Sequence, residues 1–167
     1  MPLKRDLLKD KLFDPKAFNT VFINIADENK AKKEQMDILI ELICDERHKS
    51  DRNQVLALLK GEPQAADLLM TAISEASPEN KRKLLIACWE ADLDCTPRID
   101  MFAEIVMKDD FPVAMEALTS IENMHGHITT EHAEKLLNQI MEVYPAQVDS
   151  PKGHLLADLI ELLRKWQ

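Results

Sequence analysis

Three histidines in the second half of this chain come closest to a metal-binding pattern. His125-Gly126-His127 places two imidazoles one residue apart, and His132 follows beside Glu131. Three imidazoles around one divalent cation would form a zinc-type site. The segment has no His-Glu-x-x-His motif and no cysteine ligand, and a flexible glycine between two ligands is unlike the rigid support that a metal site needs. We therefore expect solvent-facing histidines without a bound metal, and we expect no other cofactor.

Aromatic and acidic residues gather near two predicted helix ends and form a second candidate site. Trp89, Glu90 and Asp92 end one predicted helix, and Glu122 and Asn123 end another about one repeat later. An aromatic and acidic lip of this kind suits a basic peptide from a protein partner. In a simpler interpretation, Trp89 packs in the core and the acids only solvate the helix end. Both interpretations remain open at the level of sequence.

The cysteines give no support for nucleophilic catalysis. Cys44, Cys88 and Cys95 are an odd number without Cys-x-x-Cys spacing, and each lies within or beside an apolar helical stretch. Cys88 has no histidine near it in sequence that would lower its pKa. These features are typical of reduced, buried thiols in a cytosolic protein. We predict no catalytic residues and a non-enzymatic, cytoplasmic protein.

The elements that position these residues follow from an apolar pattern that recurs along the chain. Two apolar residues, a gap of two and two more apolar residues begin at positions 39, 68, 101 and 136, so the intervals are 29, 33 and 35 residues. Each copy is one face of a helix, and the interval leaves room for one further helix and two turns. The pattern predicts an all-α stack of antiparallel helix pairs.

Helix starts are indicated by hydroxyl residues that directly precede proline, at Ser77-Pro78, Thr96-Pro97 and Ser150-Pro151. Together with the apolar pattern they predict helices at 3–12, 15–26, 29–46, 51–60, 63–75, 78–92, 97–108, 111–123, 129–144 and 151–166. The predicted core consists of Leu39, Ile43, Leu69, Ile73, Leu85, Phe102, Ile105, Leu118, Leu137 and Ile140.

The segment from Met101 to Met124 resembles the joint between successive HEAT-type repeats. An apolar helix is followed by the acidic turn Lys108-Asp109-Asp110 and then by a helix rich in small residues. The similarity extends over residues 36 to 145, although Ala114 and Met115 occupy the region where such repeats often carry an arginine. The resemblance implies a right-handed α-α superhelix of the HEAT/ARM type.

The domain organisation expected from this fold is a single repeat domain over residues 1–167. Residues 1–27 would be capping helices, 28–145 the repeats and 146–167 a C-terminal capping helix. An open end of such a stack must be covered, and the basic, leucine-containing N-terminal stretch suits that role.

The charge and the length of the apolar runs exclude further classes of function. The net charge is −9, and it divides into +3 over residues 1–33 and −12 over the remainder. A continuous basic lining for phosphates is therefore missing, and the longest apolar runs, of about six residues, are too short to span a membrane. We predict a module that binds an unidentified protein, as a monomer or weak homo-oligomer, without nucleic acid or membrane. The alternatives are a HEAT-like DNA-repair enzyme and a self-associating structural subunit.

Overall fold

The computed structural model describes residues 28–166 of the chain, and within them it contains helices and no strand, which confirms the all-α prediction for this part. The α-helices are α3 (Glu28–Cys44), α4 (Arg52–Lys60), α5 (Ala65–Glu75), α6 (Pro78–Glu90), α7 (Ile99–Lys108), α8 (Phe111–Glu122), α9 (Thr130–Val143) and α10 (Pro151–Lys165). The short 3₁₀ helices are η1 (Glu46–Asp51), η2 (Thr96–Arg98) and η3 (Tyr144–Ala146). The predicted helices 3–12 and 15–26, and with them the predicted cap 1–27, lie outside the described residues. None of the described helices is long and apolar enough to cross a membrane.

The chain divides into two compact units, Met1–Val55 and Leu56–Gln167, with the boundary inside α4. In the described part of the first unit, α3 buries Met36, Leu39, Leu42 and Ile43. These residues recur at the spacing of one helix face, and η1 packs against the same helix. The predicted core positions Leu39 and Ile43 are therefore confirmed.

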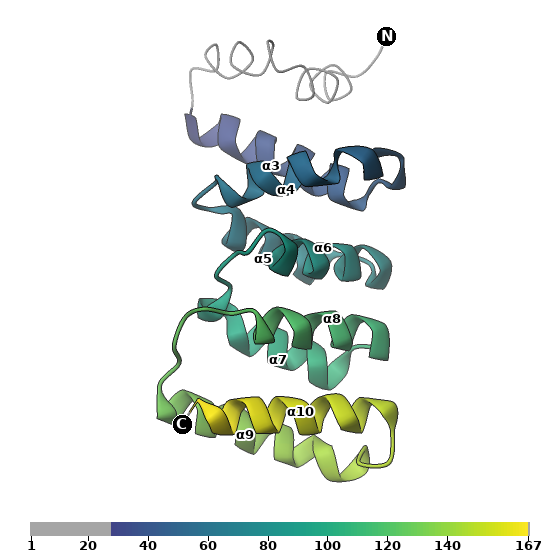
Figure 1. The fold of residues 1–167 in the computed structure, drawn as a ribbon, viewed down its shortest axis with the longest axis vertical. Coiled ribbons are helices and arrows are strands. Elements are labelled where there is room, and N and C mark those ends of the chain that lie inside the picture. Colours follow the sequence, from purple (N-terminus) through teal and green to yellow (C-terminus); the bar gives the residue numbers. More distant parts are fainter. Residues whose placement is uncertain (1–27, 167) are drawn as a thin grey trace. The chain divides into compact units, whose positions relative to one another are not determined.

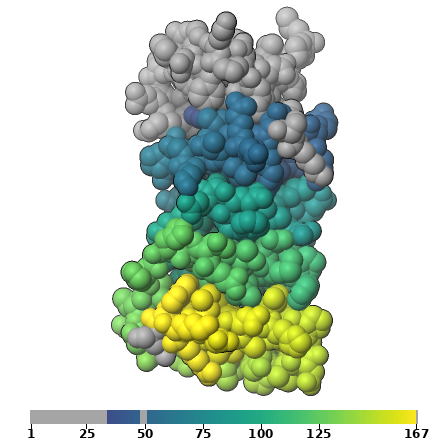
Figure 2. Space-filling model, in the orientation of Figure 1, coloured from purple at the N-terminus to yellow at the C-terminus, as the bar shows by residue number. Residues whose placement is uncertain are grey.

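Three helical hairpins form most of the second unit: α5–α6, α7–α8 and α9–α10 (Figure 1). Their second helices form one layer, in which α8 packs against α6 on one side and α10 on the other. Their first helices form another layer, in which α7 and α9 pack less closely than α6 and α8 do. In the view of Figure 2, the yellow surface of α10 faces the reader beside the green surface of the preceding hairpin.

The core of the second unit lies between these two layers. The predicted core residues Leu69, Ile73, Leu85, Phe102, Ile105, Leu118 and Ile140 are all buried. The prediction for Leu137 is wrong, because this side chain is partly exposed while Leu136 is fully buried. Helix α9 buries only Ala133, Leu136 and Ile140, a single narrow stripe, and Leu137 lies about 100° around the helix from Leu136.

Side chains cap four helices of the second unit, and three of these helices also carry proline in the first turn. Ser77, Asp110, Thr129 and Ser150 each accept a hydrogen bond from a backbone N–H at the start of α6, α8, α9 and α10. Two of the predicted Ser-Pro starts are therefore confirmed. Thr96 does not cap a helix, because it lies inside η2 and its hydroxyl oxygen accepts the N–H of Gly126 while the hydroxyl donates to the Asp94 carboxylate at 2.6 Å.

Gly153 lies in the first turn of α10, where the chain passes very close to the preceding loop. A Cβ atom at this position would lie 2.1 Å from the carbonyl oxygen of Gln147 and 2.8 Å from that of Val148. Both obstacles are backbone atoms, which cannot rotate away. The start of α10 therefore requires a residue without a side chain.

Candidate functional site

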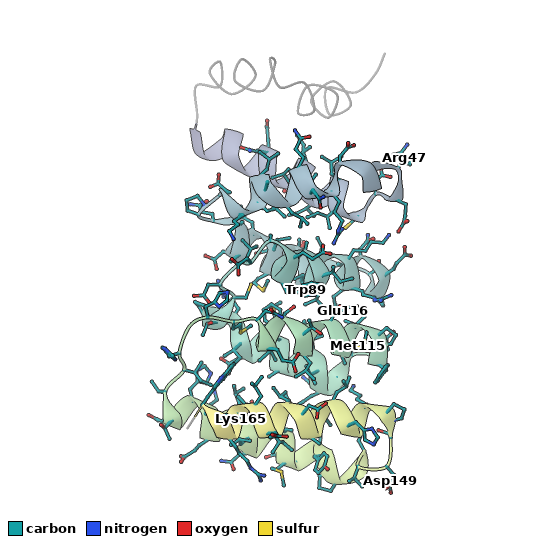
Figure 3. The ribbon with its side chains drawn as sticks, viewed as in Figure 1. Arg47, Trp89, Met115, Glu116, Asp149 and Lys165 are labelled. Carbon is teal, nitrogen blue, oxygen red and sulfur yellow. The ribbon has the colours of Figure 1, made fainter. Side chains whose placement is uncertain are left out.

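The residues of the predicted lip lie at the C-terminal ends of α6 and α8, which are neighbours in one layer. Glu90, Asp92, Glu122 and Asn123 are exposed, while Trp89 is partly buried and its indole Nε1 is buried without a hydrogen-bond partner among the described residues. Figure 3 shows Trp89 on α6 close to the neighbouring helix α8. The lip therefore exists as an exposed, mainly acidic edge, with the aromatic ring set back into the protein.

Asp92 occupies a left-handed backbone conformation in the turn that ends α6, with φ of 56°. The N–H of Leu93 donates to the carbonyl of Cys88, and the N–H of Asp92 donates to the carbonyl of Trp89, both at 3.1 Å. These two bonds form a Schellman motif, in which the left-handed residue is usually glycine. Aspartate tolerates this conformation better than most residues because its side chain is short and polar.

The carboxylate of Asp92 joins two other segments of the second unit. It accepts a hydrogen bond from Lys60 Nζ at 2.6 Å and lies 2.7 Å from His125 Nε2. The hydrogen bond from Lys60, followed by that from His125, lowers the pKa of Asp92 from 3.8 to about 2. The carboxylate of this lip residue therefore also links the end of α6 to Lys60 and His125.

A second link holds the same loops together through Thr96. Its hydroxyl donates to Asp94 and accepts the backbone N–H of Gly126 at 3.0 Å. The hydrogen bond from Thr96 lowers the pKa of Asp94. A Cβ atom on Gly126 would lie 2.6 Å from the Thr96 hydroxyl oxygen, so this glycine permits a close approach between loops.

The three histidines are not brought together around one point. His125 is two-thirds exposed and contacts Asp92, whereas His132 is less exposed and lies 2.8 Å from Asp100. His127 is exposed. Within residues 28–166, no three of the histidine, cysteine, aspartate and glutamate side chains are grouped as a metal ion would require. The imidazoles of His125 and His132 instead join successive hairpins.

Six of the polar links between helices of the second unit join residues at similar separations in sequence. The linked residues are 31 to 35 positions apart in the pairs Asp67–Arg98, Asp100–His132, Lys60–Asp92, Asp92–His125, Arg82–Glu116 and Leu85–Ser120. The recurring apolar pattern has intervals of 29, 33 and 35 residues. These six links and the apolar pattern therefore have similar spacings in sequence.

The acidic turn between α7 and α8 is a meeting point of all three hairpins. The carboxylate of Asp109 pairs with Lys81 from α6 at 2.9 Å, and its carbonyl oxygen accepts a hydrogen bond from Lys152 of α10 at 2.5 Å. Burial lowers the pKa of Lys152, although the charges of Asp109 and Asp110 oppose this effect. The turn that prompted the resemblance to repeat proteins thus has a structural role.

Cys88 and Cys95 are both buried. Hydrogen bonding to the Cys95 thiol, together with burial, raises the pKa of Cys88 well above its usual value. Because the thiolate is the reactive form, Cys88 is poorly suited to act as a nucleophile. Cys44 is more accessible than either.

Two grooves border α7 in the more loosely packed layer, and sequence reasoning identified neither of them. The groove between α7 and α9 has a volume of about 490 Å³ and is lined by Asp100, Glu104, Met107, Lys108, Lys135, Gln139, Glu142 and Val143. The groove between α5 and α7 has a volume of about 280 Å³ and shares Glu104 and Lys108. The lining of the larger groove mixes apolar side chains with both signs of charge.

Residues about one period apart line this larger groove, such as Met107 and Glu142, so only the stacking of the hairpins brings them together. One sequence signal could have indicated this groove, namely the apolar residues of α7 and α9 that fall outside the core-facing positions of these helices. Comparisons with protein-family models, with curated proteins and with solved structures find no match to this chain.

Proposed function

We propose that this chain is a non-enzymatic protein-binding module built as a HEAT/ARM-like α-α superhelix. The similar spacing of six polar links and of the apolar pattern supports a repeat architecture. The close packing of α6, α8 and α10, compared with the looser layer of α7 and α9, supports curvature with the α6–α8–α10 layer on the concave side. Stacks of this kind commonly use their concave surface to bind partners, whereas the groove described below lies in the opposite layer, so the functional half of the proposal is an analogy.

The groove between α7 and α9, here named the α7–α9 groove, is the observation that carries the proposal. Its lining residues run from Asp100 to Lys108 on α7 and from Lys135 to Val143 on α9. At 1.5 Å per residue, each wall is about 12 Å long. A groove of this length, lined by Met107, Val143 and charged side chains, can hold a segment of a protein chain.

The mixed charge of this groove supports a protein ligand over nucleic acid. Asp100, Glu104 and Glu142 oppose Lys108 and Lys135, whereas a phosphate backbone requires a mostly basic surface. The net charge of −9 adds long-range repulsion of polyanions.

The test is affinity capture with a groove variant and a matched control. Met107 is partly buried in the groove, and Met141 on α9 is 46% exposed outside it. The tagged full chain and its Met107→Glu and Met141→Glu variants would be used to capture proteins from cell extract, followed by quantitative mass spectrometry. We expect a protein that the wild type and Met141→Glu both retain and that Met107→Glu loses. Equal capture by all three chains, with circular dichroism showing all three folded, would refute the assignment of the groove.

A further inference from the structure

The charged residues of the α7–α9 groove differ in how far the chain itself neutralises them. Glu104 forms an ion pair with Lys108 one turn away on α7. Asp100 lies 2.8 Å from His132 and 3.9 Å from Lys135. Two of the three carboxylates that line the groove are therefore matched by cationic or hydrogen-bonding groups of the chain.

Glu142 is the remaining carboxylate, and it forms no ion pair with any described residue. It is exposed in the last turn of α9, which contains no basic residue. The free carbonyl groups at a helix C-terminus carry partial negative charge. The carboxylate and the helix end therefore reinforce each other, and this end of the groove favours a cation.

Apolar surface lies beside this negative end. Met107 in the last turn of α7 and Val143 at the end of α9 both line the groove and are partly exposed. The hairpins stack so that α7 and α9 run in the same direction, which brings these two helix ends together (Figure 1). One end of the groove thus combines an apolar contact surface with the unpaired carboxylate of Glu142, while Lys108 at the same end is already paired with Glu104.

We propose that the occupant of the α7–α9 groove is a cationic, amphipathic segment of a partner protein. It places a large apolar side chain on Met107 and Val143 and a lysine or arginine beside Glu142. This inference rests on the proposed function and deepens it by naming the chemistry of the partner. Charge complementarity of this type sets specificity and the association rate more than total affinity.

The probes are three short fluorescent peptides that share one length. The first has leucine and lysine at helical spacing, the second replaces lysine with glutamate, and the third replaces leucine with serine. Each would be titrated with the full-length chain by fluorescence anisotropy at low and at physiological salt. We expect the leucine–lysine peptide to bind at least about tenfold more tightly than either counterpart, which corresponds to about 1.4 kcal/mol.

Two charge reversals on α9 distinguish binding in the groove from a general attraction of the cationic peptide to the net negative charge of the chain. Glu142→Lys should weaken binding of the leucine–lysine peptide about tenfold, and Glu142→Gln about threefold. Glu134 is exposed on α9, has no ion pair with a described residue and does not line the groove. Glu134→Lys carries the same change in net charge and should alter the affinity by less than about twofold.

Different outcomes overturn the inference and the proposed function. Equal weakening by Glu142→Lys and Glu134→Lys, preference for the glutamate peptide, or no binding of the leucine–lysine peptide each overturns the cationic partner. The proposed function survives those results if Met107→Glu still abolishes capture of a protein. If Met107→Glu leaves capture unchanged, the proposed function fails independently of the peptide measurements.

Discussion

Glu116 is a nearly buried carboxylate between α6 and α8, and removal of its partner Arg82 should destabilise the second unit. The Glu116 side chain is 8% exposed, and its Oε1 atom lies 3.1 Å from the guanidinium of Arg82. Figure 3 shows Glu116 on α8 at the boundary with α6. We expect Arg82→Met, which keeps most of the apolar stem and removes the charge, to leave a buried carboxylate without its counter-ion.

The expected magnitude follows from the distance and the exposure of the two partners. Two unit charges 3.1 Å apart attract by roughly 5 kcal/mol at an effective dielectric constant of about 20, before any desolvation is subtracted. Loss of one partner of a fully buried pair costs about 3–5 kcal/mol, and loss of an exposed pair about 0–1 kcal/mol. Because Arg82 is 48% exposed and water can reach its place, we expect a loss of about 2 kcal/mol. Glu116→Gln should cost less, about 1 kcal/mol, since it leaves a solvated arginine instead of a buried charge.

Urea unfolding followed by circular dichroism gives the free energy of unfolding for each variant. Arg98→Met is the matched control, because Arg98 and its partner Asp67 are 54% and 69% exposed, and we expect a change of about 0.5 kcal/mol or less. The double variant Arg82→Met with Glu116→Leu should recover most of the loss. Equal losses for Arg82→Met and Arg98→Met would refute the argument from burial, as would a double variant less stable than Arg82→Met alone.

Three further predictions follow from the glycine, aspartate and cysteine positions described above. Gly153→Ala should lower the free energy of unfolding by more than about 1 kcal/mol, although alanine in a helix normally adds about that much stability. The control Gly61→Ala should change the free energy of unfolding little, because the nearest atom to its added Cβ would lie 3.6 Å away. Folding lowers the pKa of Asp92 from 3.8 to about 2. The contribution of Asp92 to stability is therefore complete above about pH 4 and is lost as the pH falls through about 2. Carbon-detected NMR titration would measure the pKa, and comparison with Asp92→Asn would measure the pH dependence of stability. Cys88, whose pKa is raised, should react with a thiol reagent only on unfolding, whereas mass spectrometry should find Cys44 labelled first in the folded protein.

Each of these three predictions has an outcome that would contradict it. A Gly153→Ala variant as stable as the wild type would mean that the preceding loop can move away at little cost. An Asp92 carboxyl that titrates near its ordinary value would mean that its two hydrogen bonds do not persist in solution. Labelling of Cys88 as fast as Cys44 would mean that the end of α6 opens readily.

The sequence predicted the helices well because their starts are local features. Ser77 and Ser150 cap their helices within four residues of chain and are followed by proline, so no distant contact is needed to interpret them. Thr96 has the same local pattern but a different role, since its hydroxyl binds Asp94 and Gly126. The approach of residue 126 to residue 96 depends on how the hairpins stack, which local spacing does not encode.

The candidate sites were harder to predict for the same reason. Leu137 was expected in the core because it belongs to the apolar pattern that recurs in earlier helices. The buried face of α9 is too narrow to include it. Asp92 was identified as an exposed acid near an aromatic residue, whereas Lys60 and His125 lie 32 and 33 positions away and balance its charge. The α7–α9 groove forms only where two hairpins pack together. Composition and spacing within one helix therefore cannot predict its position or size.

The six polar links that join residues 31 to 35 positions apart also bear on how the second unit folds. A link of 31 to 35 residues closes a short loop, and the entropy of loop closure grows only slowly with length. Each hairpin in such a series needs only its neighbour for docking, so folding can begin at any adjacent pair and propagate in either direction. Topologies dominated by near contacts fold quickly. We therefore expect fast refolding, with rates that depend on the stability of the first docked pair rather than on the total length of the chain.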